Sequence, residues 1–240
     1  MPELPEVETI RIGLSKFLPG YLVTATDHDW PKSFPNSTAD VKSFLIGARI
    51  TTVRRRAKVL IIDLDTEYSL IIHLKMTGQL VFRGGTDKFG AGHPTESLIG
   101  KLPDKSTRVV FNLKKDAKTA TLFFNDQRKF GWVRLIPTIE VPNIDFMKKV
   151  GPEPLEDSFT AEIFIERLQR RKNTTIKAAI LDQTVLAGIG NIYADEGLWG
   201  AKVHPATKVK DVPVKKLKKL FTELRFVLNL SIDKGGSTDR

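Results

Sequence analysis

Residues 59–75 read VLIIDLDTEYSLIIHLK, and this stretch decides the fold expected for the first half of the chain. It contains two β-rich runs, Val59–Asp65 and Ser69–Lys75, and the first opens with four consecutive apolar side chains. Such runs are typical of strands in a two-layer packing. Similar runs lie on both sides, at Arg49–Arg56, Gly78–Phe82, Arg108–Leu113, Ala120–Asn125 and Gly131–Ile136. Many short strands joined by turns predict an all-β sandwich or barrel.

A helix is expected before these strands and a long loop among them. Apolar residues recur at helical spacing near the N-terminus, at Val7, Ile10, Leu14 and Phe17. This spacing predicts a helix with one buried face, which the pair at residues 19–20, Pro-Gly, should end. Residues 84–106 are rich in Gly, Pro, Asp, Lys and Ser, and this composition predicts a long loop.

The second half of the chain has a different pattern. Residues 137–154 contain four prolines, which is typical of a linker. Helical periodicity follows at Thr160–Arg171, Thr174–Leu181, Asn191–Trp199 and Pro213–Ile232. The sequence therefore predicts a two-domain α+β protein. It has an N-terminal β-sandwich with a flanking helix over residues 1–137, a linker over 138–153 and a helical domain over 154–240.

The charge of the chain points to an anionic partner. The formal net charge of the 240 residues is +10 and the isoelectric point is near 9.7. Basic residues cluster at 54–58 and at 202–225, where eight Lys or Arg accompany two acids. A surplus of this size favours a nucleic acid, or an anionic membrane, although solubility is the plainer interpretation. Clusters in both halves suit a nucleic acid that contacts two domains.

The composition also excludes several classes of protein. The chain has no cysteine, which excludes disulfides, thiol catalysis and a zinc site with Cys ligands within these residues. Its four histidines are spread along the sequence and do not predict a metal site. No run approaches the roughly 18 apolar residues of a membrane span. The opening MPELPEVETI carries acids where a signal peptide carries basic residues, which argues against secretion.

The N-terminus contains a candidate nucleophile. Pro2 is small enough for Met1 to be removed, which would leave a free secondary amine. An α-amino group has a pKa near ~7.7–8, against about 10.4 for Lys, so a sizeable fraction is unprotonated at neutral pH. Such an amine attacks a carbonyl-like carbon and forms an iminium, with Glu3 beside it to transfer protons. The alternative is that these residues only begin a helix, where Pro and acids are favoured.

Five further motifs follow this N-terminus in order. They are RAK at 56–58, HLKMTG at 73–78, DQRKFG at 126–131, GPEPL at 151–155, and LDQ at 181–183 leading to AGIGNIYADE at 187–196. Together with MPELPEVETIRIGL at 1–14, they resemble the bacterial formamidopyrimidine-DNA glycosylases, repair enzymes that remove 8-oxoguanine and ring-opened purines. The opening resembles this family rather than its sister, endonuclease VIII, which begins PEGPE.

The resemblance implies catalytic roles near the N-terminus. Pro2 resembles the nucleophile that attacks C1′ of the damaged nucleoside, and Glu3 the general acid/base that assists sugar ring opening and base loss. Glu6 resembles a supporting acid. Lys58 matches a lysine that binds a phosphate beside the lesion; the alternative is a solvated lysine at the end of a strand.

Other matches imply DNA-binding residues in the predicted sandwich. His73 matches a residue close to the DNA backbone, although it could equally be a hydrogen-bonded structural histidine. Met76, Arg128 and Phe130 resemble the triad that fills the gap left when a base is flipped out of the duplex. The alternative is that Met76 and Phe130 are core residues, but the glycines that follow them predict exposed turns.

The helical half carries two more matches. Lys177 aligns with a family lysine near the DNA. Asn191 follows Gly188-Ile189-Gly190 at the predicted start of a helix, where free N–H groups bind anions. It resembles the phosphate-binding asparagine of a helix–two-turn–helix element, although by itself this segment would be a weak signal and only a turn. The fold implied is a β-sandwich joined to a C-terminal helix–two-turn–helix domain, with DNA between the two.

The chain departs from the family at its C-terminal end. Family members continue past residues 235–238 into a lesion-capping loop and a zinc finger with four Cys, and this sequence has neither. We therefore expect no cofactor in this chain, although the family implies zinc, and favour truncation over a shortened natural form. The implied partner is double-stranded DNA with an oxidised purine or an abasic site. We expect a monomer in the bacterial cytoplasm, without a membrane partner.

The function that the resemblance implies is base excision repair. The chain would be a bifunctional DNA glycosylase and AP lyase that removes oxidised purines through a Pro2 Schiff base with β,δ-elimination. An endonuclease VIII-like enzyme for oxidised pyrimidines is an alternative, which the opening motif and the triad disfavour. A damaged-DNA-binding module without turnover is a second alternative because the finger is missing, and an RNA-binding protein is a third.

Overall fold

The computed structural model describes residues 1–236, which form two compact units. Among the described residues, one unit contains 1–2 and 6–144, and the other contains 3–5 and 145–236. Each unit has a hydrophobic core of its own. Helix α1 (Leu4–Phe17) begins with residues of the second unit and continues into the first.

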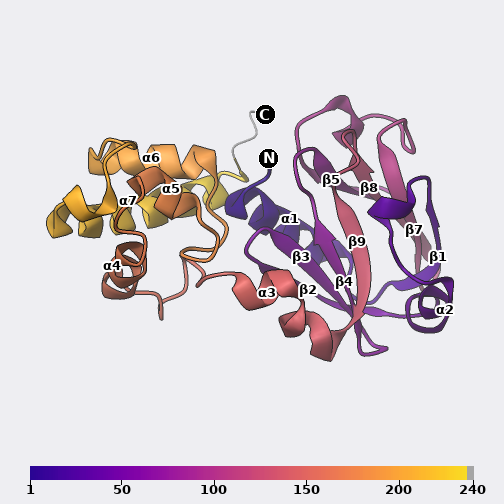
Figure 1. The fold of residues 1–240 in the computed structure, drawn as a ribbon. Coiled ribbons are helices and arrows are strands. Elements are labelled where there is room, and N and C mark those ends of the chain that lie inside the picture. The colour runs from indigo at the N-terminus through magenta and orange to yellow at the C-terminus, as the bar shows by residue number, and fades with distance from the viewer. Residues whose placement is uncertain (237–240) are drawn as a thin grey trace. The chain divides into compact units, whose positions relative to one another are not determined.

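The first unit is a sandwich of two antiparallel sheets (Figure 1). One sheet has the strand order β1-β7-β8-β5-β6, with β1 (Leu22–His28), β7 (Thr107–Lys115), β8 (Lys118–Asp126), β5 (Gly78–Gly84) and β6 (Asp87–Gly92). The other has the order β2-β3-β4-β9, with β2 (Ile50–Arg56), β3 (Val59–Leu64), β4 (Tyr68–His73) and β9 (Trp132–Pro137). Short helical segments lie between strands, at η1 (Pro31–Ser33), α2 (Thr38–Asp40), η2 (Val41–Leu45) and η3 (Glu96–Leu98), and η4 (Thr138–Asn143) follows β9. The predicted β-sandwich is confirmed.

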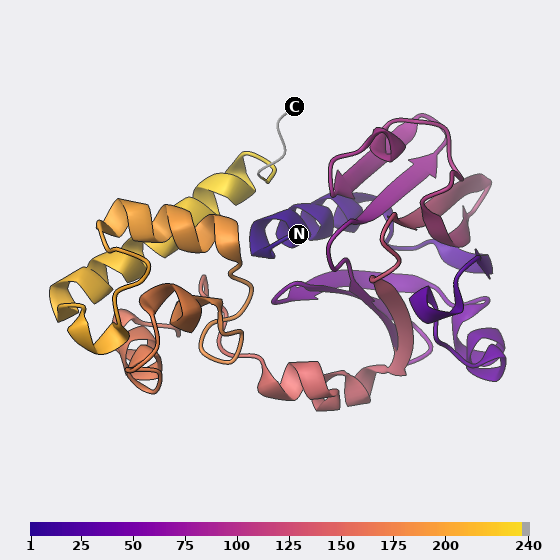
Figure 2. The same cartoon turned by 45° about the horizontal axis from the view of Figure 1, so that its top comes forward.

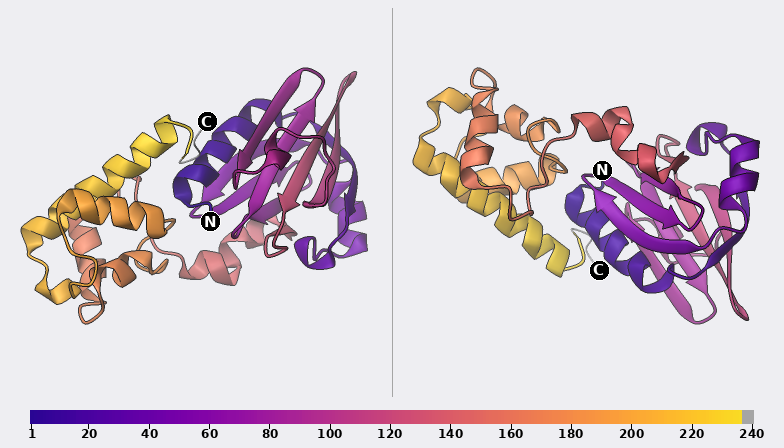
Figure 3. Two further views of the ribbon diagram at one scale, coloured as in Figure 1. Left: turned by 90° about the horizontal axis from the view of Figure 1, so that it is seen from above. Right: turned by 90° about the horizontal axis from the view of Figure 1, so that it is seen from below.

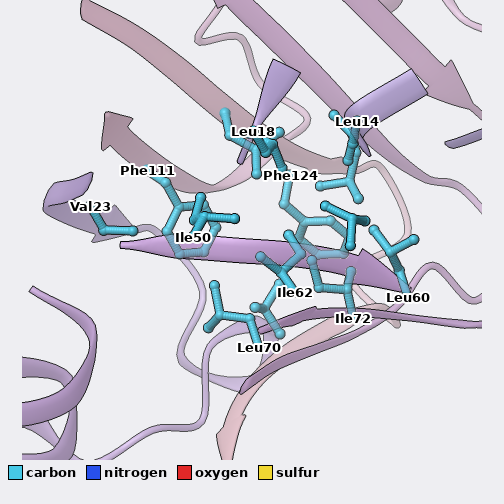
Figure 4. Close-up of a cluster of buried hydrophobic side chains, with 14 of the residues drawn as sticks. Leu14, Leu18, Val23, Ile50, Leu60, Ile62, Leu70, Ile72, Phe111 and Phe124 are labelled. Atoms are coloured by element: carbon cyan, nitrogen blue, oxygen red, sulfur yellow. The ribbon is translucent and has the colours of Figure 1, made fainter. Parts of the chain in front are cut away.

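The core of this unit lies between the two sheets, and side chains of both sheets and of α1 meet in it (Figure 4). In the register of β3 and β4, Ile62 lies opposite Leu70 and Ile61 opposite Ile71. Ile62 and Leu70 belong to the core between the sheets, whereas Ile61 and Ile71 are buried on the other face. Burial on both faces explains why these central strands have apolar runs instead of alternation.

Helix α1 packs against the two layers of the sandwich (Figure 2). Its predicted apolar face is confirmed, because three of the four residues are fully buried in the core and the fourth packs against it: Val7, Ile10, Leu14 and Phe17.

Two strands of the larger sheet lie outside the sequence prediction. β1 is an edge strand in which only Val23 is buried, so it has no apolar run to reveal it. β6 corrects the first part of the predicted loop over 84–106, because it pairs with β5 from Gln79 opposite Gly92 to Gly84 opposite Asp87. The glycines there serve a tight turn and a packed hairpin instead of an open loop. Residues 93–106 contain no strand, as predicted for a loop, but they include the short η3.

The second unit is helical. Its helices are α3 (Asp145–Lys149), α4 (Ala161–Gln169), α5 (Ile176–Leu181), α6 (Asn191–Ala201) and α7 (Val214–Asp233), with the short η5 (Val209–Asp211) before α7. Thr160 and Thr175 cap α4 and α5 through their side chains. α6 and α7 lie side by side (Figure 3), and Gly197 allows a close approach, since a Cβ there would overlap Leu224.

The two units meet in sequence between Ile144 and Asp145. Residues 138–153, predicted as a linker, contain η4 and α3. The exact bounds of the two domains and of the linker stay a prediction.

Candidate functional site

In the second unit, the carboxylate of Glu3 is held at the start of α6. It accepts the backbone N–H groups of Gly190 (2.7 Å) and Ile192 (3.0 Å), and a longer contact from Tyr193 (3.5 Å). The residue is only 3% exposed. The positive end of a helix favours a negative charge at this place, and charge-assisted hydrogen bonds are the stronger kind. The candidate acid/base is therefore fixed by the backbone.

The residues before α6 shape this cradle. A Cβ on Gly190 would overlap the carboxyl group of Glu3. Gly188 has a φ of +82°, and a Cβ there would lie 2.8 Å from Leu4, whose N–H donates to the Gly188 carbonyl (3.0 Å). The side chain of Gln183 supports the turn by accepting the Gly188 N–H (2.9 Å). Glycine is needed here because the backbone must approach residues 3–4 closely.

The sequence predicts that the amides at the start of α6 are free to bind an anion from outside the protein, and the structure differs. Three of them face Glu3 instead. Asn191 is exposed, so its side chain is the group that this position offers to solvent. Lys177 of α5 pairs with Asp195 of α6 (2.7 Å), one turn after Asn191. Asn191 and Asp195 are four residues apart and therefore lie on one face of α6. Lys177 contacts that same face through its ion pair with Asp195.

Pro2 directly precedes Glu3 and Glu6 lies three residues after it, and both are buried. Met1 precedes Pro2, so the Pro2 nitrogen is part of a peptide bond until Met1 is removed. His93, for which the sequence predicts no role, interacts electrostatically with the N-terminal amino group of Met1. Burial, and then the positive N-terminus, lower the pKa of His93, and Asp126 opposes them.

In the first unit, adjacent strands bring Lys58 and His73 to one end of the smaller sheet. Val59 pairs with His73, and His73 pairs with Trp132. Lys58 therefore immediately precedes the strand beside His73. Its side chain is only 6% exposed, so the alternative of a solvated strand-end lysine is wrong.

The basic cluster at 54–58 is partly neutralised by acids. Arg54 pairs with Asp63 (2.6 Å), and Arg55 pairs with Glu8 of α1 (2.9 Å). Arg55 also donates to the carbonyl of Ala57 (2.9 Å), whose φ of 51° forms the turn before Lys58. Burial alone would raise the pKa of Glu8, but hydrogen bonds from arginine side chains outweigh that effect and lower it. Two of these charges therefore stabilise the fold around Lys58.

His73 is neutral at physiological pH. Burial, followed by the charges of Lys75 and Lys58, lowers its pKa to about 3. Its Nδ1 accepts the backbone N–H of Lys75 (3.1 Å), so the proton of the neutral ring lies on Nε2. His73 can therefore donate a hydrogen bond from Nε2, but it does not offer a positive charge.

Two turns that cross between the sheets carry the predicted triad. Residues 74–77 join β4 to β5, and residues 127–131 join β8 to β9. Gly78 pairs with Asp126 and His73 pairs with Trp132, so the two turns lie side by side. We call them the tip turns. The structure thus brings both parts of the triad to the end of the sandwich that carries His73.

The triad side chains are exposed at the tip turns. Met76 is 38% exposed and Phe130 is 54% exposed, and Arg128 is exposed as well. Cζ of Arg128 lies 4.9 Å from the centre of the Phe130 ring, which is a cation–π distance. Met76 and Phe130 are therefore not core residues, and their positions at turns agree with the sequence prediction.

Sequence reasoning assigned no role to two residues inside these motifs, Thr77 and Asp126. The Thr77 hydroxyl donates to Asp126, and the Asp126 carboxylate also accepts the Gly131 N–H (2.6 Å). One signal was available: a Thr and an Asp border the two turns, and such residues bind turn amides through their side chains. The pairing of two turns about 50 residues apart is visible only in the fold.

The residues of this chain do not fit the zinc that the family implies. The sequence has no cysteine. Within residues 1–236, no three His, Asp or Glu side chains gather as a metal site would require. The same part of the chain has no helix with the length and apolar character of a membrane span.

A sandwich unit and a helix–two-turn–helix unit on one chain define a class of two-domain DNA glycosylases. The formamidopyrimidine-DNA glycosylase N-terminal domain matches residues 1–133, and the H2TH domain of the same enzymes matches residues 150–240. The chain belongs to the formamidopyrimidine-DNA glycosylase family.

Relatives and solved structures agree with this assignment. The formamidopyrimidine-DNA glycosylase of Herpetosiphon aurantiacus is 41% identical over 99% of this chain and 81% of its own length. That of Pelotomaculum thermopropionicum is 37% identical over 100% of this chain and 81% of its own length. The Lactococcus lactis enzyme bound to AP-site DNA has a TM-score of 0.82 at 32% identity, covering 98% of this chain and 83% of that one. MutM in complex with DNA that contains carbocyclic 8-oxo-G has a TM-score of 0.84 at 32% identity, covering 100% and 82%.

Proposed function

We propose that this protein is a bifunctional DNA glycosylase and AP lyase that removes oxidised purines, 8-oxoguanine and formamidopyrimidines, from double-stranded DNA. The observation that carries the proposal is the fixed carboxylate of Glu3 directly after Pro2. Covalent amine catalysis needs a nucleophilic amine and a positioned proton-transfer group. Membership of a family named for formamidopyrimidine removal supports the substrate class.

The reaction begins when the Pro2 nitrogen, freed by removal of Met1, attacks C1′ of the damaged nucleotide. The bond from C1′ to the base breaks, the base leaves with a proton, and Glu3 assists opening of the sugar ring. The product is an iminium between Pro2 and C1′, which withdraws electrons. Loss of a C2′ proton then expels the 3′ phosphate, and loss of a C4′ proton expels the 5′ phosphate. Water finally hydrolyses the imine and restores the amine.

The remaining predicted residues would hold DNA in two chemically different ways. Lys58 and Lys177 would bind phosphates as cations, whereas the neutral His73 and Asn191 would donate hydrogen bonds. At the tip turns, the triad would enter the space of the flipped base. An extruded base leaves an unstacked step, which apolar wedge side chains can fill.

Borohydride trapping tests the proposal directly, because it reduces the iminium to a stable adduct. Two duplexes are compared, one with 8-oxoguanine opposite cytosine and one with an abasic site. We expect an adduct on both duplexes from protein that has lost Met1, as verified by intact mass. Glu3→Gln should lose most of the adduct on 8-oxoguanine. The matched control inserts one alanine between Met1 and Pro2, which keeps an amine but moves it away from Glu3.

The other outcomes separate the alternatives. An adduct on the abasic duplex alone would support a lyase that does not excise 8-oxoguanine, and oxidised pyrimidines would then be tested in its place. No adduct on either duplex, with Met1 shown to be absent, would contradict the enzyme and favour a damaged-DNA-binding module.

A further inference from the structure

The two tip turns share one buried carboxylate, that of Asp126, which has no exposed surface. Its Oδ1 accepts the hydroxyl of Thr77 and the N–H of Arg128 (3.2 Å). Its Oδ2 accepts the N–H of Gly131 (2.6 Å). These donors come from both turns. Asp126 is therefore a common partner of the segment that carries Met76 and the segment that carries Arg128.

Thr77 completes this connection from the other turn. Its hydroxyl donates to Asp126 and accepts the backbone N–H of Arg128 (3.1 Å). That N–H is thus shared between Thr77 and Asp126. The Thr77 hydroxyl therefore links the two tip turns to each other. Because Thr77 follows Met76 directly in the chain, this link also restrains the backbone next to Met76.

A buried arginine, Arg108, binds the backbone of Asp126. Nε of Arg108 donates to the backbone carbonyl of Asp126 (2.9 Å), and its guanidinium also binds the Asp29 carboxylate and the Lys105 carbonyl. Arg108 is itself buried. A buried polar network in which every member is satisfied holds its parts rigidly.

A cation–π contact steadies the same turn from outside this network. Nζ of Lys129, the residue between Arg128 and Phe130, lies 4.8 Å from the centre of the Trp30 ring. The turn is therefore tied to the sandwich at its side chains as well as at its backbone.

We propose that Thr77 and Asp126 are positioning residues that hold Met76 in register with Arg128 and Phe130, so that the triad enters DNA as one preorganised wedge. This inference rests on the proposed function, in which the triad replaces the flipped base. Separating a base step costs free energy, and a group that is already ordered loses less entropy on binding. A displacement of about 1 Å in such a constellation can slow a reaction about 100-fold.

Thr77→Val tests the link, because it keeps the branched shape and removes the hydroxyl. We expect single-turnover excision of 8-oxoguanine opposite cytosine to slow about 10- to 100-fold. Trapping on an abasic duplex should change less than about threefold, because extruding a site without a base costs least. Thr77→Ser, which keeps the hydroxyl, should restore excision to within about threefold of the wild type. A merely structural role would lower both reactions together, and that result would overturn the inference.

Amide hydrogen exchange provides a measurement that does not depend on catalysis. Asp126→Asn introduces N–H donors where three donors already converge. We expect the amides of Arg128 and Gly131 to exchange at least about tenfold faster in this variant, with the rest of the sandwich unchanged. Unchanged exchange at both amides would overturn the inference. If the wild type traps neither duplex, the proposed function fails, whereas exchange still decides whether Thr77 and Asp126 order the turns.

Discussion

The position of Glu3 depends on backbone N–H groups at the start of α6 and on glycines that leave room for its carboxylate. Donors on the main chain of α6 cannot leave by a change of rotamer, so the carboxylate is held as long as the backbone keeps its path. The absence of a Cβ at Gly190 provides the space that the carboxylate occupies. The methyl group of an alanine at position 190 is therefore enough to test whether this space positions the Glu3 carboxylate.

Gly190→Ala should displace the Glu3 carboxylate, because the new Cβ would overlap it. We expect excision of 8-oxoguanine to fall about 100-fold and the free energy of unfolding to fall by about 1–3 kcal/mol. The matched control is Gly200→Ala, whose Cβ would meet only the far end of the flexible Glu223 side chain. That variant should keep activity and gain helix propensity. Equal losses in both variants would contradict the role given to Gly190.

His73 should make stability depend on pH in a defined window. Its pKa is about 3 in the folded protein and 6.5 when unperturbed, so the unfolded chain takes up the proton first. The contribution of the neutral His73 to the free energy of unfolding is complete above pH 6.5 and is lost as the pH falls towards 3. Urea unfolding between pH 6.5 and 4.5 should show the free energy falling by up to about 1.4 kcal/mol per pH unit. His73→Gln should flatten this slope, with the other three histidines as a common background; parallel slopes would contradict the neutral state.

At the scale of elements, the sequence predicts strands with long apolar runs and misses those without them. β3 and β4 are predicted because both of their faces are buried. β1 is missed because one face of an edge strand is solvated, and β6 because its glycines are also typical of loops. What makes β6 a strand is its pairing with β5 and the packing of Phe89, which are contacts between separate segments.

The packing of β6 on α1 gives a test at this scale. A Cβ on Gly13 would overlap the ring of Phe89. Gly13→Ala should therefore lower the free energy of unfolding by about 1–3 kcal/mol, although alanine alone favours a helix by about 1 kcal/mol over glycine. Phe89→Leu in the same chain should recover part of that loss, measured as a coupling of at least about 0.5 kcal/mol in a double-mutant cycle. Additive effects would contradict contact between α1 and this hairpin.

For the whole molecule, a count of charges along the sequence overestimates the positive charge that the basic cluster at 54–58 offers to a partner. Asp63 and Glu8 neutralise Arg54 and Arg55, and neither acid is adjacent to its partner in sequence. Local turn signals correctly predict exposed turns at Met76 and Phe130. That Lys58, His73 and the tip turns share one end of the sandwich follows only from the pairing of the strands. The contact of Glu3 with α6 could not be predicted, because it joins residues almost 190 positions apart.

The salt dependence of DNA binding tests whether Lys58 binds a phosphate. For a duplex with an uncleavable abasic analogue, Lys58→Gln should reduce the slope of log K against log salt by about 0.9. Lys118 is a suitable control, because it begins β8 whereas Asp126 ends that strand, far from the tip turns. Lys118→Gln should leave the slope unchanged in fluorescence anisotropy between about 50 and 200 mM salt. Similar changes in both variants would indicate a diffuse charge effect.

The central claim is that the Pro2 amine forms the covalent intermediate with the damaged nucleotide. Peptide mapping by mass spectrometry of the borohydride-trapped adduct on 8-oxoguanine opposite cytosine tests it most directly. The account predicts that the deoxyribose-derived mass is attached to the N-terminal peptide, at the nitrogen of Pro2. An adduct on a lysine side chain, or no adduct from protein that has lost Met1, would contradict it.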